Sequence, residues 1–146
     1  MEIRVQAEPF DPGAELVATG RDDPLVGGVA AFTGVVRGEG GLLALEIEHY
    51  PGMTERAIRR FAEEAAGRFG LRDVRVVHRH GRLAVGEPIM MVATAAPHRA
   101  DAFAAAEFLM DWLKSRAPFW KREIREGGCA AWVEAKEADE AALGRW

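Results

Sequence analysis

The sequence has little of several features that would mark particular classes of protein. It holds a single cysteine, Cys129, which excludes an internal disulfide and a metal site built from several cysteines. Its apolar runs fall well short of the roughly 20 residues that a membrane-spanning helix needs. Its net charge is −4, whereas nonspecific binding to nucleic acid needs a broad basic surface. The class of the protein therefore has to come from what the chain does contain.

The composition is that of an ordinary globular protein. The 146 residues are 49% hydrophobic and 29% charged, and a chain of this length can bury a substantial core. No internal repeat and no clear linker divides it, so we expect one domain over residues 1–146. The segment from Met1 to Arg4 lacks the apolar stretch of a signal peptide, and we expect a cytoplasmic protein.

A basic and aromatic segment near the carboxyl terminus is the most informative part of the chain. Five basic residues fall within twelve positions, among three large rings: Lys114, Arg116, Lys121, Arg122 and Arg125, with Trp112, Phe119 and Trp120. A solvated basic tail would lack the rings. Local positive charge on an acidic protein, set among apolar side chains, predicts a walled pocket for an anion.

Capping residues and helical spacing predict three helices. Asp11 is a typical N-cap and is followed by proline, while Gly70 and Pro118 stand where helices end. The predicted helices are a short one that ends near Gly20 and two long ones, at about Pro51–Phe69 and Pro97–Arg116. We interpret the apolar stripes of the long helices, at 53–69 and 102–113, as core or dimer surface.

Alternating and continuous apolar runs predict the strands. They lie at Glu2–Ala7, Val29–Arg37, Leu42–Tyr50, Val74–His80, Ile89–Ala95, Phe119–Arg125 and Cys129–Ala135. Residues 38–41 form a glycine-rich loop, residues 81–88 a short connection, and Gly127-Gly128 an internal turn. The resulting fold class is α+β, with a mixed, mostly antiparallel sheet and two long helices.

Several motifs, in order along nearly the whole chain, resemble a known family. They are residues 32–37 (FTGVVR), 48–53 (EHYPGM), 78–81 (HRHG) with 86–87 (GE), 97–99 (PHR) and 118–123 (PFWKRE). The chain is similar to the large, catalytic subunits of molybdopterin synthase, the MoaE family, whose α/β hammerhead fold it would share. One departure is the loop at 38–41, which is shorter than is usual in the family and lacks its asparagine.

The resemblance implies a sulfurtransferase. The family converts cyclic pyranopterin monophosphate into molybdopterin, the dithiolene ligand of molybdenum. Sulfur arrives as a thiocarboxylate on the C-terminal Gly-Gly of a small ubiquitin-like subunit. The large subunits form a homodimer, and one small subunit at each end completes a heterotetramer. No cofactor or metal of the enzyme's own is implied.

The resemblance also assigns roles to residues. It implies that Lys114 and Lys121 are catalytic. It implies substrate binding by Val35, Val36, Arg37, His98, Arg99, Lys114, Lys121, Arg122 and Glu123. The residue types suit the chemistry, because an arginine fork pairs well with phosphate and a lysine adapts its pKa to its surroundings. A lysine here could stabilise developing negative charge, move a proton or attack the acyl carbon of the tail.

Each of these residues also has an interpretation without function. Lys114 would form a surface ion pair with Asp111, Lys121 would be an exposed strand residue, and Arg37 an ordinary charged strand end. His98 and Arg99 would be a polar first turn, although cations suit that end of a helix poorly. His78 and His80 share a strand face, but we expect no metal there, and Cys129 is expected in the core.

The spacing of the predicted site residues suggests a dimeric site. Arg99 and Lys114 lie fifteen positions apart on one predicted helix, or about 22 Å along its axis. A pterin-sized ligand cannot touch both, so we expect Lys114 and Lys121 to meet His98 and Arg99 of a second copy. The alternative function is a noncatalytic dimer that binds a phosphorylated metabolite for regulation. Only the enzyme requires a partner that ends in Gly-Gly.

Overall fold

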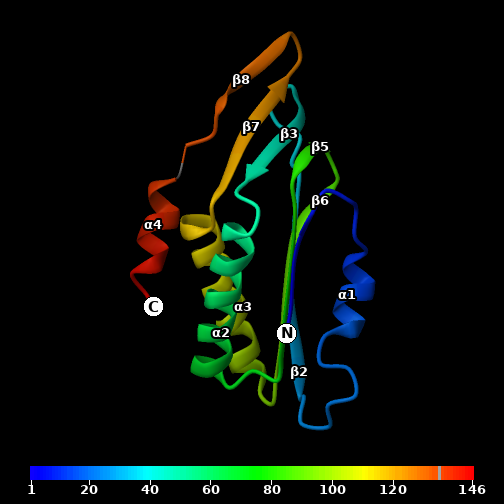
Figure 1. The fold of residues 1–146 in the computed structure, drawn as a ribbon, viewed down its shortest axis with the longest axis vertical. Coiled ribbons are helices and arrows are strands. Elements are labelled where there is room, and N and C mark those ends of the chain that lie inside the picture. Colours follow the sequence, from blue (N-terminus) through cyan, green and yellow to red (C-terminus); the bar gives the residue numbers. More distant parts are fainter. Residues whose placement is uncertain (135) are drawn as a thin grey trace.

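The computed structural model describes residues 1–134 and 136–146, and it shows two sheets with helices packed beside them (Figure 1). The elements, in chain order, are β1 (Glu2–Gln6), α1 (Pro12–Ala18), β2 (Gly28–Val35), β3 (Leu42–His49), α2 (Met53–Phe69), β4 (Asp73–Arg79), β5 (Gly81–Ala84), β6 (Pro88–Ala96), α3 (Arg99–Arg116), β7 (Phe119–Arg125), β8 (Gly128–Trp132) and α4 (Glu137–Leu143).

Each sheet has four strands. The first has the order β1-β4-β6-β2, in which only the β1–β4 pair is parallel. The second has the order β5-β3-β7-β8 and is antiparallel throughout. The α+β class with a mixed, mostly antiparallel arrangement is therefore confirmed. The division of the strands into two sheets depends on long-range pairing, which the sequence pattern did not reveal.

The two long helices form where their sequences provide ends and an apolar face. In α2 the Glu55 carboxylate accepts a hydrogen bond from the Gly52 amide at 2.7 Å, and Gly70 takes the left-handed conformation that stops the helix. In α3 the chain enters at His98 and leaves at Ala117, just before Pro118. Both helices thus lie within two residues of their predicted ends.

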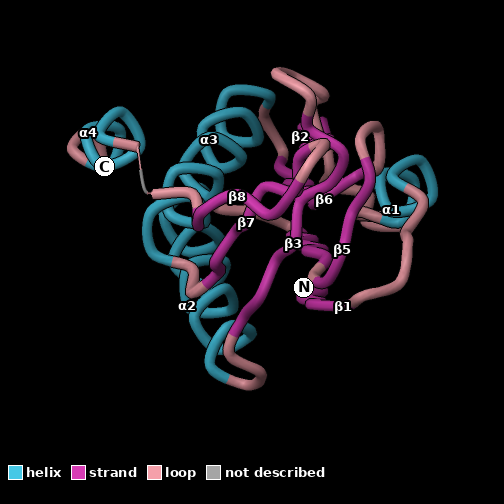
Figure 2. The backbone as a smooth tube through the Cα atoms, turned by 90° about the horizontal axis from the view of Figure 1, so that it is seen from above, coloured by secondary structure: helices cyan, strands magenta, loops and turns pink. Residues whose placement is uncertain are grey.

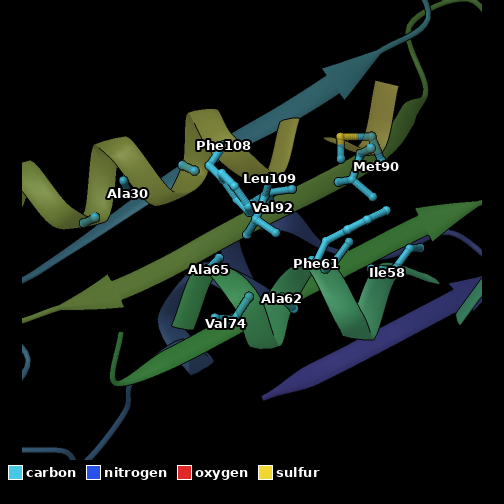
Figure 3. Close-up of a cluster of buried hydrophobic side chains, with 14 of the residues drawn as sticks. Ala30, Ile58, Phe61, Ala62, Ala65, Val74, Met90, Val92, Phe108 and Leu109 are labelled. Atoms are coloured by element: carbon cyan, nitrogen blue, oxygen red, sulfur yellow. The ribbon is translucent and has the colours of Figure 1, made fainter. Parts of the chain in front are cut away.

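The main core lies between these helices and one face of the first sheet. Ile58, Phe61 and Ala65 of α2 face Phe108 and Leu109 of α3, and both rows pack on the strands (Figure 3). The helix α1 lies on the opposite side of that sheet (Figures 1 and 2). Its predicted cap is confirmed, because Asp11 accepts hydrogen bonds from the amides of Gly13 and Ala14.

Several predicted boundaries differ from the structure. The connection predicted at 81–88 contains β5, a strand of four residues. The helix α4 was not predicted. The last strand ends at Trp132, and the predicted end at Ala135 lies outside the described residues, as does the side chain of Cys129. Of the helices that the structure describes, none combines the length and apolar composition needed to cross a bilayer.

Candidate functional site

The two predicted catalytic lysines lie near each other, at the point where α3 passes directly into β7. Lys114 lies in the last turn of α3, and Lys121 lies on the strand that begins immediately after Pro118. The proline cannot continue the helix, so the chain turns back within three residues. The positive charge of Lys114 is close enough to lower the pKa of Lys121. The sequence therefore brings two like charges together by a local turn.

Lys121 has largely apolar neighbours within the second sheet. Lys121 lies two residues after Phe119 on β7, so the two side chains share one face of the sheet. On the neighbouring strand β3, its paired residue is the buried Ile47. Burial is the main reason that its pKa lies below the ordinary value of 10.5. The charges of Lys114 and Lys136 lower this pKa further, while Asp139 opposes them.

Lys114 has a different environment. Its side chain is 51% exposed, and its Nζ lies 3.7 Å from the Asp139 carboxylate of α4. The interpretation without function expected an ion pair with Asp111, but the carboxylate that Lys114 contacts is that of Asp139. Asp111 instead accepts hydrogen bonds from Arg145 at 2.9 Å and from the Trp146 indole at 2.6 Å. Lys114 is thus a half-exposed cation with an acidic partner, whereas Lys121 is a largely buried one.

The carboxyl-terminal segment supplies two site residues that the sequence analysis missed, Lys136 and Asp139. The Ser115 hydroxyl donates to the Asp139 carbonyl at 2.9 Å, and Arg116 pairs with Glu140 at 2.6 Å. These contacts fix α4 beside the end of α3 (Figures 1 and 2). The only sequence signal was a charged run without an apolar stripe, which is typical of a solvated segment.

Three histidines, His49, His78 and His80, cluster near Phe119 at the start of β7. The ring of His78, on β4, stacks on Phe119 with centroids 3.7 Å apart, and its Nδ1 lies 2.8 Å from the Arg79 carbonyl. Burial lowers the pKa of His78 to about 3, and the charge of Lys121 contributes to that shift. His49 and His80 have ring centroids 4.5 Å apart and line an open groove of about 440 Å³. His78 is therefore neutral at physiological pH.

The predicted substrate residues on β7 already have partners within the chain. Arg122 donates to Glu46 at 2.6 Å, and its guanidinium lies over the Trp132 ring. Glu123 accepts from Arg125 at 2.5 Å. Arg122 points to the face opposite Lys121, because neighbouring strand residues alternate. These pairs restrain β7 immediately after the lysine.

The predicted substrate residues at the end of β2 and just after it differ in burial. Val36 is 2% exposed and forms a small core with Ile47 and Leu83, whereas Val35 is 49% exposed. Arg37 is 76% exposed on its side chain and pairs with Glu39 of the short loop at 3.1 Å. Arg37 is thus available to a ligand, and the structure records no contact between it and the lysines.

His98 and Arg99 lie at the far end of α3 from the lysines (Figure 1). Both are exposed, and His98 caps the helix without a side-chain hydrogen bond. The helix between them and Lys114 is continuous from Arg99 to Arg116, so it spans about 25 Å. Within one chain, the structure does not bring these two groups of predicted site residues together.

Comparison with known proteins places these features in a family. The family described as "MoaE protein" matches residues 5–116. The molybdopterin synthase catalytic subunit of Cereibacter sphaeroides is 65% identical, over the full length of both chains. The structure of the molybdopterin biosynthesis MoaE protein from Burkholderia ambifaria has a TM-score of 0.86 and 50% identity, and it covers 99% of this chain and 97% of its own. Molybdopterin synthase from Staphylococcus aureus has a TM-score of 0.81 and 30% identity, with 89% and 95% covered.

Proposed function

The chain belongs to the MoaE family of molybdopterin synthase catalytic subunits, and we propose that it transfers sulfur to cyclic pyranopterin monophosphate to form the molybdopterin dithiolene. The observation that carries this proposal is the pair of cations at the junction of α3 and β7, together with the 65% identity to a catalytic subunit along the full chain. A phosphate-bearing substrate needs cationic partners, and the reaction needs groups that stabilise charge and move protons.

The two lysines suit different steps. Lys121, whose pKa is lowered by burial, loses its proton more readily than an ordinary lysine, so it suits the role of a base or a nucleophile. Lys114 is half-exposed and adjustable, so it suits the stabilisation of negative charge on the substrate or on the attacked acyl group. Asp139 holds Lys114 in place until an anionic ligand takes over that role.

The sulfur must come from a partner. The chain has one cysteine and no other thiol, so it offers no evident store of transferable sulfur. We propose that a small ubiquitin-like subunit presents a thiocarboxylate on its C-terminal Gly-Gly to Lys114 and Lys121. Attack by this sulfur on a substrate carbon would displace an oxygen function from that carbon and give a thioester. Its hydrolysis would leave the sulfur on the substrate as a thiolate and release the tail as an ordinary carboxylate.

The complete site is proposed to form between two copies of this chain. His98 and Arg99 of one copy would bind the same substrate as Lys114 and Lys121 of the other, in a homodimer that two small subunits extend to a heterotetramer. A twofold axis gives two equivalent sites of this kind. The anionic group of the substrate would then also meet the free amides at the start of the partner's α3. Val35, Val36 and Arg37, with Arg122 and Glu123, complete the proposed substrate contacts.

The reaction is proposed to take place in the cytoplasm. A phosphorylated substrate does not cross a bilayer unaided, because burying its charge in hydrocarbon is too costly. The enzyme must therefore share a compartment with the enzymes that make the substrate. Cell fractionation followed by immunodetection of the chain tests this placement, and recovery of the protein from a different compartment would contradict it.

A reconstitution assay tests the proposed reaction directly. The purified chain is mixed with the substrate and with the small subunit, which carries either a thiocarboxylate or an ordinary carboxylate. Dithiolene product is expected only with the thiocarboxylate. Product formation by the chain with free sulfide at a comparable rate would contradict the need for a carrier. Tight substrate binding without product under any condition would favour the noncatalytic alternative.

A further inference from the structure

One polar residue interrupts an apolar row of the first sheet. Every second residue of β4 points to the same face of the sheet, and these residues are Val74, Val76 and His78. The two valines are part of the main core. His78 is only 4% exposed. Burial of an imidazole is costly unless it is hydrogen-bonded, and this ring has the Arg79 carbonyl as a partner at 2.8 Å.

The position of His78 links the two sheets at the catalytic strand. Its partners on β1 and β6 belong to the first sheet, whereas the Phe119 ring against which it stacks begins β7 of the second sheet. The two rings are nearly parallel, with an interplanar angle of 17°. Phe119 in turn packs against both core clusters. The stack therefore fixes the start of β7, two residues before Lys121.

The hydrogen bond of His78 defines its tautomer. The Arg79 carbonyl can only accept, so Nδ1 of His78 carries a hydrogen. Because burial keeps the ring neutral, Nε2 carries none. The ring is thus a flat, uncharged body that adds no positive charge beside Lys121. A charged ring at this position would repel the lysine, and a smaller side chain would admit water beneath it.

We propose that His78 is a positioning residue for the reaction, which with Phe119 forms a neutral wall that holds the Lys121 side chain in place and excludes water from it. The proposal rests on the proposed function for its purpose, but the wall is a property of this chain alone. In the described part of the chain, the charged groups that act on Lys121 are Lys114 of α3, and Lys136 and Asp139 of the carboxyl-terminal segment. His49 lies behind the wall, opposite Phe119 on β3.

The test is the reactivity of Lys121 as a function of pH. Brief labelling of the full-length protein with acetic anhydride, followed by digestion and mass spectrometry, gives a midpoint for Lys121, with Lys114 as an internal reference. In the wild-type protein the midpoint should lie below that of a free lysine. His78→Ala should raise it by about one pH unit, because water then reaches the ammonium group. His78→Phe keeps a flat neutral ring and should leave the midpoint within a few tenths of a unit.

Two further variants keep the test decisive. His80→Ala removes a histidine ring two residues away that does not stack on Phe119, and the Lys121 midpoint should not change. If His78→Ala does not fold, Phe119→Leu removes the other ring of the wall and should raise the midpoint in the same direction. An unchanged midpoint in the folded His78→Ala protein, or in Phe119→Leu, overturns the proposal, and so does an equal rise in His78→Phe. Labelling needs neither substrate nor partner, so failure of the proposed reaction remains a separate result.

Discussion

The two ends of α3 hold the predicted site residues in opposite physical settings. At the carboxyl end, Lys121 is largely buried, Lys114 pairs with Asp139, and the segment from Lys136 onward lies beside both. At the amino end, His98 and Arg99 are exposed. The first group is shaped by its own chain, which alters its chemistry. The second group offers positive charge and the backbone amides at the start of α3. Its side chains are exposed, so their contacts come from the ligand that binds there.

This contrast separates reactivity from recognition. Burial and nearby cations change the pKa of Lys121, so the carboxyl end of α3 is where bond-making steps can be assisted. The amino end can hold an anion through charge and hydrogen bonds, which is a binding role. The predictions that follow test this division, from the largest expected effect to the smallest.

Removing either lysine should have the largest effect. Lys114→Ala and Lys121→Ala should each lower turnover about a hundredfold or more while leaving the fold intact, because one charge contact in a transition state is worth about 3 kcal/mol. Rates of dithiolene formation measure the loss, and circular dichroism checks the fold. Arg59→Ala, which removes an exposed cation from α2, is the matched control. Near-normal turnover by both folded lysine variants would remove them from the mechanism.

Exchanging lysine for arginine should distinguish the two lysines. Arginine keeps the positive charge but does not lose its proton in proteins. Lys121→Arg should therefore be nearly as inactive as Lys121→Ala, whereas Lys114→Arg should stay within about tenfold of the wild-type rate. Single-turnover rates over a range of pH measure the difference. Comparable activity in the two arginine variants would mean that the buried and the exposed lysine do the same work.

Changing the amino end should mainly weaken binding. Arg99→Ala should raise KM for the substrate about tenfold to a hundredfold, because a hydrogen bond to a charged group contributes roughly 1.5–3 kcal/mol. Its kcat at saturating substrate should change less than that of either lysine variant. Steady-state kinetics give both values, with Arg59→Ala again as the control. A large fall in kcat without a change in KM would place Arg99 in the chemical step and end the division between the two ends.

The buried end should also make folding sensitive to acid. The pKa of His78 is about 3 in the folded protein and near 6.5 when unfolded, so the unfolded state binds the extra proton between these values. Stability from this residue is complete above pH 6.5 and is lost at about 1.4 kcal/mol per pH unit as the pH falls toward 3. Urea unfolding of His78→Phe should show a smaller loss between pH 6.5 and 5. The exposed His98→Asn variant is the comparison, and equal losses in all three proteins would contradict this account.

Local signals predicted most of the fold. The ends of both long helices follow from Gly70 and Pro118 and from apolar residues at helical spacing, which act over a few residues. By contrast, β5 has only four residues between two turns, and α4 lacks a buried residue among its seven. Such short elements depend on contacts with distant strands and helices, which no local pattern reports.

The candidate site was predictable only where it is local in sequence. Lys114 and Lys121 are seven positions apart on either side of a proline, so their proximity followed from the chain itself. The contributions of His78 from β4 and Asp139 from α4 depend on the meeting of the two sheets and on the docking of the carboxyl-terminal segment. For the contribution of His78, the sequence offered one signal, which is a histidine in a row of apolar valines.

The central claim is that each site combines the carboxyl end of α3 from one chain with the amino end of α3 from a second chain. Subunit mixing tests this claim most directly. Arg99→Ala and Lys114→Ala proteins are combined, allowed to exchange and assayed at a substrate concentration well below the wild-type KM, where each variant alone should have low activity. In a mixed dimer one site carries both changes and the other carries neither, so activity should return to about half the wild-type value per mixed dimer. If native mass spectrometry shows that subunits exchange and activity does not return, each site is built within a single chain and the claim is wrong.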